Sequence, residues 1–339
     1  MSLDYEKPEE NEPQITPEEF LRDQKSSIRK RSFWAIGIGA FVVAAHLVWL
    51  TVFSVAGLKP DFSVLFRSIF FILGLFVFAA GIWGIYYAKN LTIKDFIASP
   101  EAVEYLEQAR HTKLYYTYIL VGLLVVVYLV QMAADSGSGR DSEELPLSIE
   151  LAGFVKPLFR QGEYWRILTG GALHGMILHL YFNAQALYGF GSSIEFLANR
   201  AHLAIVFVLA ITGGGFLSLV FMPETISIGA SGGIMGLVGY LAIFGYRRKT
   251  QLPPDFLKSM LINVGFIAAF GVIAYQIVDN FAHLGGLLTG AIYGFVQIPR
   301  DSTENPRNVG TIANISGLIA LGIFITTCIF SILLLLRLI

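Results

Sequence analysis

The sequence predicts an all-α protein that crosses a membrane several times. Hydrophobic residues make up 55% of its 339 residues, and charged residues only 14%. The mean hydropathy is +0.62, which is too apolar and too poor in charge for a soluble chain of this length. Apolar stretches of about 20 residues, enough to cross about 30 Å of hydrocarbon, recur along the chain and predict a polytopic arrangement.

Nine stretches meet that length. The predicted spans lie near 33–57, 65–88, 114–133, 173–192, 201–221, 227–246, 257–276, 280–298 and 311–336. They predict nine transmembrane helices. The chain divides into a cytoplasmic polar tail at 1–32, an N-terminal transmembrane hairpin with a cytoplasmic linker at 33–112, six helices at 113–300 and a C-terminal helix at 301–339.

Basic residues fall in alternate loops, so the N-terminus is predicted to be cytoplasmic and the C-terminus to lie outside. The polar, acidic N-terminus resembles neither a cleavable signal nor an organelle transit peptide. This combination predicts an integral membrane protein of a bacterial plasma membrane. The outer loop near 134–172 mixes aromatic residues with Lys156, Arg160 and Arg166, and we expect it to lie in the headgroup layer.

Several chemical classes are disfavoured. The net charge is −1, and the basic residues form only short clusters, so no nucleic-acid partner is expected. Cys328 is the single cysteine, which excludes a disulfide and a thiolate metal site. His174 and His179 are five residues apart, which turns them by roughly 140° on a helix, and no zinc-protease motif is present. We therefore expect no metal and no cofactor.

Polar groups on three predicted spans share one depth. Asn183, Ser231 and His283 each precede the basic residue that ends their span by 16 or 17 residues. Each therefore lies about 24–26 Å above the cytoplasmic boundary, at about 1.5 Å per residue. His179 lies one helical turn before Asn183 and points from the same face. Polar side chains are costly in hydrocarbon and usually face a protein interior or a wet cavity.

Each of these groups also has a plainer interpretation. The run Gly229-Ala230-Ser231-Gly232 could be a close-packing patch between helices. His283 could be a satisfied core histidine, and His179 with Asn183 could be interhelical hydrogen-bonding groups. Four such groups at one depth on three parallel helices favour a functional site over these separate roles.

In their order and spacing, these residues resemble the rhomboid family of intramembrane serine proteases. The matching elements are Trp165-Arg166, His174-x4-His179-x3-Asn183, Glu195, Gly229-x-Ser231-Gly232 and His283-x2-Gly286-x3-Gly290. They cover roughly 113–300. The resemblance implies a six-helix core there, with two extra transmembrane helices before it and one after it.

The resemblance implies roles for these positions. Ser231 would be the nucleophile and His283 its general base, without a catalytic carboxylate. Asn183 and His179 would form the oxyanion hole with the Ser231 amide. The remaining elements would be structural: Trp165, Arg166, His174, Glu195, Gly229, Gly232, Gly286 and Gly290.

The implied function is cleavage of membrane proteins in or beside a transmembrane helix, with the lipid bilayer as the other partner. The alternative is a non-catalytic rhomboid-like protein that binds membrane helices for sorting or quality control. Relatives of that kind lack the serine or the histidine, whereas Ser231 and His283 are both present.

Two positions and the extra helices leave questions open. Asp279 precedes His283 by four residues, so it could be a third catalytic member or the N-cap of the helix, and we favour the cap. Met235 stands where many rhomboids carry an aromatic ring against the histidine, which would leave a more flexible contact. For the three extra helices, bracing, partner contact and substrate docking all remain open.

Overall fold

The computed structural model describes residues 16–55, 65, 68–96, 99–110, 112–139, 144–300 and 304–339, and these residues are mostly helical. They fall into two compact units, residues 1–97 and residues 98–339. Residues 1–15 of the predicted tail at 1–32 and the join between the first two predicted spans lie outside the described residues.

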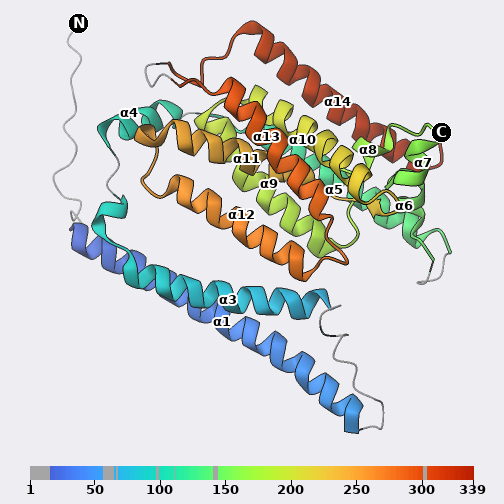
Figure 1. The fold of residues 1–339 in the computed structure, drawn as a ribbon, viewed down its shortest axis with the longest axis horizontal. Helices are drawn as coiled ribbons and strands as arrows, with labels where there is room; N and C mark the ends of the chain where they lie inside the picture. Colours follow the sequence, from blue (N-terminus) through green and yellow to red (C-terminus); the bar gives the residue numbers. More distant parts are fainter. Residues whose placement is uncertain are drawn as a thin grey trace, which may run out of the picture. The chain divides into compact units, whose positions relative to one another are not determined.

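The first unit is a helical hairpin. Helix α1 (Pro17–Val55) lies along α3 (Ile69–Asn90), which is followed by the short 3-10 helix η1 (Ile93–Phe96) (Figure 1). Helix α1 begins well before the predicted span at 33–57. Its start is a capping box, in which the Glu19 amide donates to Thr16 Oγ1 over 3.2 Å and the Thr16 amide donates to Glu19 Oε2 over 3.1 Å.

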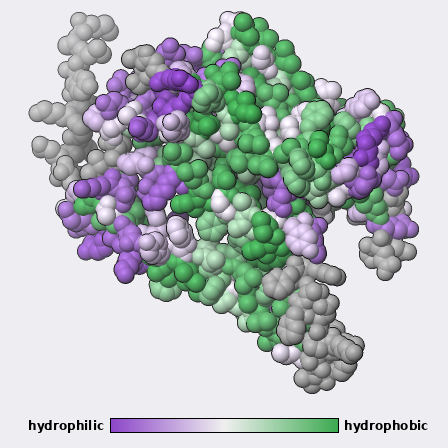
Figure 2. All heavy atoms as spheres, viewed as in Figure 1, coloured by the Kyte–Doolittle hydropathy of each residue, from purple (hydrophilic) through white to green (hydrophobic). Residues whose placement is uncertain are grey.

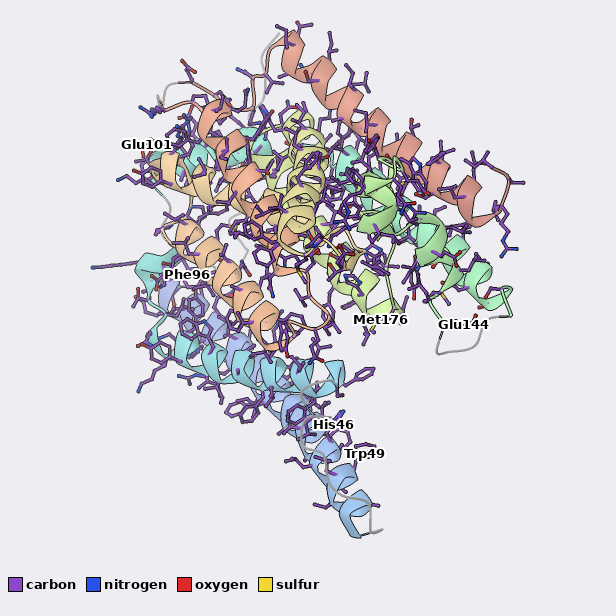
Figure 3. All side chains as sticks on the ribbon, turned by 45° about the vertical axis from the view of Figure 1, so that its right-hand side comes forward. His46, Trp49, Phe96, Glu101, Glu144 and Met176 are labelled. Carbon is purple, nitrogen blue, oxygen red and sulfur yellow. The ribbon has the colours of Figure 1, made fainter. Side chains whose placement is uncertain are left out.

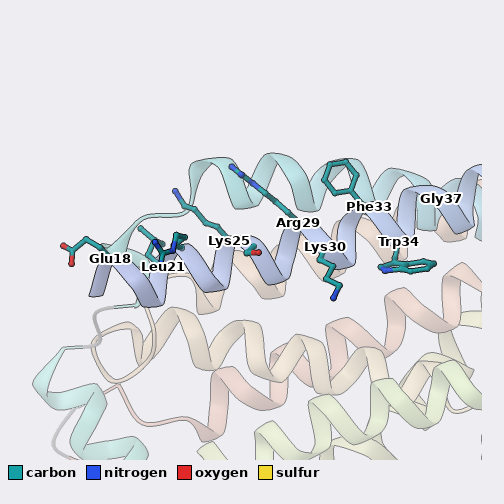
Figure 4. A pocket seen from close by; sticks show the side chains of 10 residues that line it. Glu18, Leu21, Lys25, Arg29, Lys30, Phe33, Trp34 and Gly37 are labelled. Atoms are coloured by element: carbon teal, nitrogen blue, oxygen red, sulfur yellow. The ribbon is translucent and has the colours of Figure 1, made fainter. Parts of the chain in front are cut away.

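Side chains on α1 serve two structural purposes. His46 contacts the Val42 carbonyl through Nδ1 at 2.8 Å and Ser68 Oγ through Nε2 at 2.9 Å, so its ring joins α1 to the start of α3 (Figure 3). Near the predicted cytoplasmic end, basic and aromatic side chains line a groove on α1, among them Arg29, Lys30 and Trp34 (Figure 4). Arginine, lysine and tryptophan in that position are typical of a membrane interface.

The described residues of the second unit form seven long helices and several short elements. The long helices are α5 (Tyr115–Ser136), α9 (Ile177–Leu197), α10 (Arg200–Phe221), α11 (Ser231–Arg247), α12 (Phe256–Ile273), α13 (Asn280–Gln297) and α14 (Thr311–Leu335). The short elements are α4 (Pro100–Ala109), α6 (Leu147–Ala152), β1 (Phe154–Val155), α7 (Lys156–Arg160), α8 (Arg166–Thr169), β2 (Ile226–Ser227) and η2 (Lys249–Gln251).

Each of the nine predicted spans corresponds to a helix, and the all-α polytopic fold class is confirmed. Among the described residues, six helices are long and apolar enough to cross a membrane: α1, α3, α5, α10, α12 and α14. The other three, α9, α11 and α13, carry the candidate site residues. Helix α11, with 17 residues, is shorter than any of those six. In α9 and α13, polar residues and glycines replace part of the apolar content that a spanning helix otherwise has. Apolar side chains cover much of the helix surfaces, as a lipid environment requires (Figure 2).

Helix α10 is the centre of the second unit. More than half of the residues in its most apolar stretch are buried, and it packs against α9, α11, α13 and α14. Helix α14 lies along α10, where Phe207 and Phe324 meet edge to face with ring centroids 5.1 Å apart. Helix α12 is peripheral: it contacts α11 and α13, and only Met260 and Gly271 on it are buried.

The outer loop is folded against the helices. Strand β1 pairs antiparallel with β2, and Phe154 lies opposite Ser227. Lys156 and Arg166 of this loop are buried, at 0% and 4% exposure, so their side chains contact the protein interior. The position of the loop in the headgroup layer stays a prediction. The polar partners of Arg166 lie within the protein, since it donates to Glu163 Oε2 over 2.6 Å and to the Gly153 carbonyl over 2.9 Å. Arg160 is exposed and pairs with Glu224.

Candidate functional site

Glycine contacts hold α11 parallel to α13. A Cβ atom at Gly286 would overlap the Gly232 carbonyl oxygen, and one at Gly290 would overlap the Gly236 carbonyl oxygen. The two helices therefore run in the same direction with their backbones in direct contact. At the start of this seam, a Cβ atom on Gly232 would lie 3.5 Å from the Ala282 carbonyl oxygen. The residue after Ser231 thus packs beside the residue before His283.

Ser231 is the first residue of α11 and is half-buried. The predicted span at 227–246 includes a strand and a turn, because β2 ends at Ser227 and the helix begins only at Ser231. The backbone N–H groups of a first helical turn have no partner within the helix, and the helix dipole makes that end partly positive. A group reacting at Ser231 would meet these N–H donors.

Gly229 fixes the turn that leads into α11. Its φ angle is +117°, a conformation that side chains disfavour, and a Cβ atom there would lie 2.7 Å from the His179 ring. Its amide donates to the Gly170 carbonyl over 2.9 Å. A glycine is therefore required at this position, and the turn is tied to the loop that precedes α9.

His179 lies in the first turn of α9, against Gly229 and His174. The two histidine rings meet edge to face with centroids 5.0 Å apart. His174 is fully buried, and neither of its ring nitrogens has a hydrogen-bond partner among the described residues. The backbone of His174 is held by Gln131 on α5, which accepts from its amide at 3.1 Å and donates to its carbonyl at 2.8 Å.

Asn183 is the next polar residue along this face of α9. Its side chain is buried, and Nδ2 donates to the His179 carbonyl over 3.0 Å. An amide nitrogen carries two hydrogens, so this bond leaves a second donor on Asn183. His179 and Asn183 thus present an imidazole and an amide beside the Gly229 turn.

His283 occupies the first turn of α13, and Asp279 caps this helix. Asp279 Oδ1 accepts from the Ala282 amide at 2.9 Å, so the predicted N-cap is confirmed. The other oxygen, Oδ2, accepts from the hydroxyls of Ser218 and Ser227 and lies 3.6 Å from the Lys156 ammonium nitrogen. The hydrogen bonds of this carboxylate therefore go to serine hydroxyls and a backbone amide.

Two opposed effects set the pKa of Asp279. Burial raises it, but the hydrogen bonds from Ser218, Ser227 and the Ala282 amide, together with the charge of Lys156, lower it below the ordinary value. For Lys156, burial lowers the pKa of the ammonium, and the neighbouring Asp279 carboxylate opposes that shift. The pair is thus a carboxylate and an ammonium whose charged atoms lie 3.6 Å apart.

The remaining predicted residues lie away from Ser231. Trp165 stacks on the Arg166 guanidinium, with 4.6 Å from its Cζ to the ring centroid, and meets Phe330 of α14 edge to face at 5.3 Å. Glu195 lies near the other end of α9, where it accepts from the Thr117 amide at 2.7 Å and from the Thr117 hydroxyl at 2.5 Å. It therefore caps α5, the neighbouring helix.

Sequence reasoning missed Gln131 and Lys156. A single amide side chain within an apolar span was a signal for Gln131, because such a group needs a partner in hydrocarbon. Within the described part of the chain, no group of three or more His, Cys, Asp or Glu side chains is arranged to hold a metal ion.

Comparison with known proteins identifies the core. Residues 161–300 match the family model of the rhomboid domain. This part of the chain is a rhomboid domain, similar to proteins of the rhomboid family. The chain is 34% identical over 161 residues to RHOMBOID-like protein 6, mitochondrial, of Arabidopsis thaliana, covering 45% of this chain and 50% of that protein. It is 29% identical over 179 residues to Rhomboid protease GluP of Bacillus subtilis, covering 52% of this chain and 33% of that protein.

The chain therefore spans half or less of the length of these rhomboid relatives. The protein is a multi-pass membrane protein that contains a rhomboid domain. The expectation of a bacterial plasma membrane is not supported, because the similar proteins include a mitochondrial plant protein as well as a bacterial one.

Proposed function

We propose that this rhomboid protein is an intramembrane serine endopeptidase that works with a Ser231–His283 dyad. The observation that carries the proposal is the glycine seam between α11 and α13. It brings the start of α11, where Ser231 lies, against the turn of α13 that carries His283. A hydroxyl beside an imidazole, at a partly positive helix end, is the arrangement that acyl transfer requires.

In the proposed reaction, Ser231 Oγ attacks the carbonyl carbon of a substrate peptide bond while the His283 imidazole takes the hydroxyl proton. The imidazolium then gives this proton to the leaving amine, and the C–N bond breaks. A water molecule, deprotonated by His283, hydrolyses the resulting ester and frees Ser231. Water must therefore reach the dyad from the predicted outer face.

The tetrahedral intermediate carries a negative oxygen, which needs donors that are already in place. The backbone N–H groups at the start of α11, the free Asn183 amide hydrogen and the His179 ring would supply them. Loss of one such donor typically lowers turnover by about 10²–10³-fold. The half-buried state of His179, Ser231 and His283 leaves each of them partly accessible to a substrate.

The proposed substrates are membrane proteins, cleaved in or near a transmembrane helix. A helix offers no free peptide carbonyl, so small or helix-breaking residues are expected near the bond that is cut. Helix α12 would border the access path, because it is the least buried long helix of this unit and packs mainly on α11 and α13.

Cleavage of a single-span membrane substrate tests the proposal. Ser231→Ala should abolish cleavage and labelling by a fluorophosphonate probe while the protein stays monodisperse in detergent. Ser193→Ala is the matched control, since this hydroxyl donates to the Gly189 carbonyl of its own helix, and this variant should cleave normally. Continued cleavage by Ser231→Ala would remove Ser231 from the nucleophile role. An inactive wild type that still binds membrane helices would favour the non-catalytic alternative.

A further inference from the structure

A buried polar cluster lies beside the candidate dyad and has no part in the proposed chemistry. The Lys156 ammonium donates to Thr225 Oγ1 over 2.6 Å and to Ser227 Oγ over 2.9 Å. It also pairs with Asp279 at 3.6 Å. Four segments meet here. Lys156 follows β1, and Ser227 lies in β2. Ser218 of α10 donates a hydrogen bond to Asp279, which caps α13.

The cluster is close to both reacting residues along the chain. Ser227 precedes Ser231 by four residues, with the Gly229 turn between them. Asp279 precedes His283 by four residues and caps the helix that carries it. Ser227 donates to Asp279, so one hydrogen bond already joins the segment that leads to Ser231 to the segment that leads to His283. Lys156 contacts the same two residues and anchors both to the strand pair.

Burial of the Lys156–Asp279 pair has a free-energy cost that its hydrogen bonds must offset. The Lys156 side chain is 0% exposed and that of Asp279 is 17% exposed. A buried ammonium is costly unless charge and hydrogen bonds compensate it, and here its neighbours are a carboxylate and two hydroxyls. An exposed pair links nearby parts of the same segments: Arg160 and Glu224, at 2.6 Å, are 44% and 73% exposed. Exposed pairs contribute little to stability.

We propose that Lys156 is a positioning residue of the rhomboid site, which holds the turn before Ser231 and the cap of the His283 helix in one register. The inference rests on the proposed dyad. Lys156 touches neither substrate nor reacting atoms, so its effect is on the rate at which Ser231 reacts. Removing the ammonium takes away its hydrogen bonds to Thr225 and Ser227 and its charge beside Asp279, which loosens the strand pair from α13.

The test compares single and double variants by fluorophosphonate labelling of Ser231 and by cleavage of a single-span substrate. Lys156→Met should lower both the thermal midpoint and the labelling rate, because it leaves Asp279 without its cation. Lys156→Met with Asp279→Asn removes both charges and keeps an N-cap side chain, so the midpoint should recover. The rate should not recover: we expect labelling and kcat about tenfold below wild type, with KM unchanged, since small misplacements are costly in catalysis.

The outcomes separate positioning from stability. Arg160→Met is the matched control and should label at the wild-type rate. A double variant that labels as fast as wild type would show that Lys156 only stabilises the fold, and this would overturn the inference even where Lys156→Met alone fails to fold. Wild-type protein that is not labelled at Ser231 would overturn the proposed dyad and the inference with it. Labelled wild type with an unimpaired double variant would leave the dyad intact and overturn the inference alone.

Discussion

A Cβ atom at Gly286 would overlap the carbonyl oxygen of Gly232, so α11 and α13 are in backbone contact directly beside the candidate dyad. This contact determines how near Ser231 and His283 come, because each lies within three residues of it. Helix packing at such a point tolerates no side chain larger than hydrogen without a shift of one helix.

Gly286→Ala should therefore separate the two helices. Overpacking of this kind typically costs about 1–3 kcal/mol, and we expect a lower thermal midpoint together with loss of most substrate cleavage. Gly322→Ala on α14 is the control, since a Cβ atom there meets nothing within 4 Å. Normal stability and cleavage in Gly286→Ala would contradict the close packing at this seam.

Asp279→Asn distinguishes a dyad from a triad. Asparagine can still cap α13, and in the structure the hydrogen bonds of Asp279 go to Ser218, Ser227 and the Ala282 amide. We expect Ser231 labelling to persist within about tenfold of wild type, whereas loss of a catalytic carboxylate costs about 10⁴-fold. A loss near the larger figure, in protein that remains folded, would make Asp279 a third catalytic member.

The stability that Asp279 provides should depend on pH. Burial raises the pKa of its carboxyl, but hydrogen bonds and Lys156 outweigh burial and hold the pKa below the ordinary 3.8. A pKa that is depressed in the folded state means stability that is present above pH 3.8 and lost as the pH falls through the lower folded value.

Thermal midpoints of wild type and Asp279→Asn in detergent, measured from pH 7 to pH 3, check this sign. The advantage of wild type should be constant above about pH 5 and should shrink below the unfolded pKa. Other carboxyls titrate equally in both proteins and cancel in the difference. A difference that stays constant, or grows, as the pH falls would contradict the assigned direction.

The helices could be predicted from sequence because lipid imposes both apolar composition and length. Their ends could not be placed by the same signal. The span expected from 227 begins as a helix only at Ser231, because Ile226 is apolar whether it lies in a strand or a helix. Helix α1 begins at Pro17, since the capping box of Thr16 and Glu19 extends it into polar sequence that hydropathy does not detect.

The candidate site residues and their common depth could be proposed from the sequence and stay predictions, whereas the residues that support them could not be foreseen. Counting from basic residues gives depth along a helix, and depth placed Ser231 and His283 in one layer. The burial of Lys156 could not be predicted, because its partner Asp279 is more than a hundred residues away and becomes a neighbour only when β1 pairs with β2. A lysine in a loop otherwise indicates contact with water or headgroups.

The extra C-terminal helix is expected to brace the outer loop, because Phe330 of α14 packs edge to face on Trp165 at 5.3 Å. Phe330→Ala should lower the thermal midpoint, since such ring pairs contribute about 0.5–1.5 kcal/mol beyond burial. It should also increase proteolysis near Trp165, measured by limited digestion in detergent. Ile329→Ala is the control, because this side chain is 52% exposed on the same helix. Equal digestion of the two variants would mean that α14 does not hold the loop through this contact.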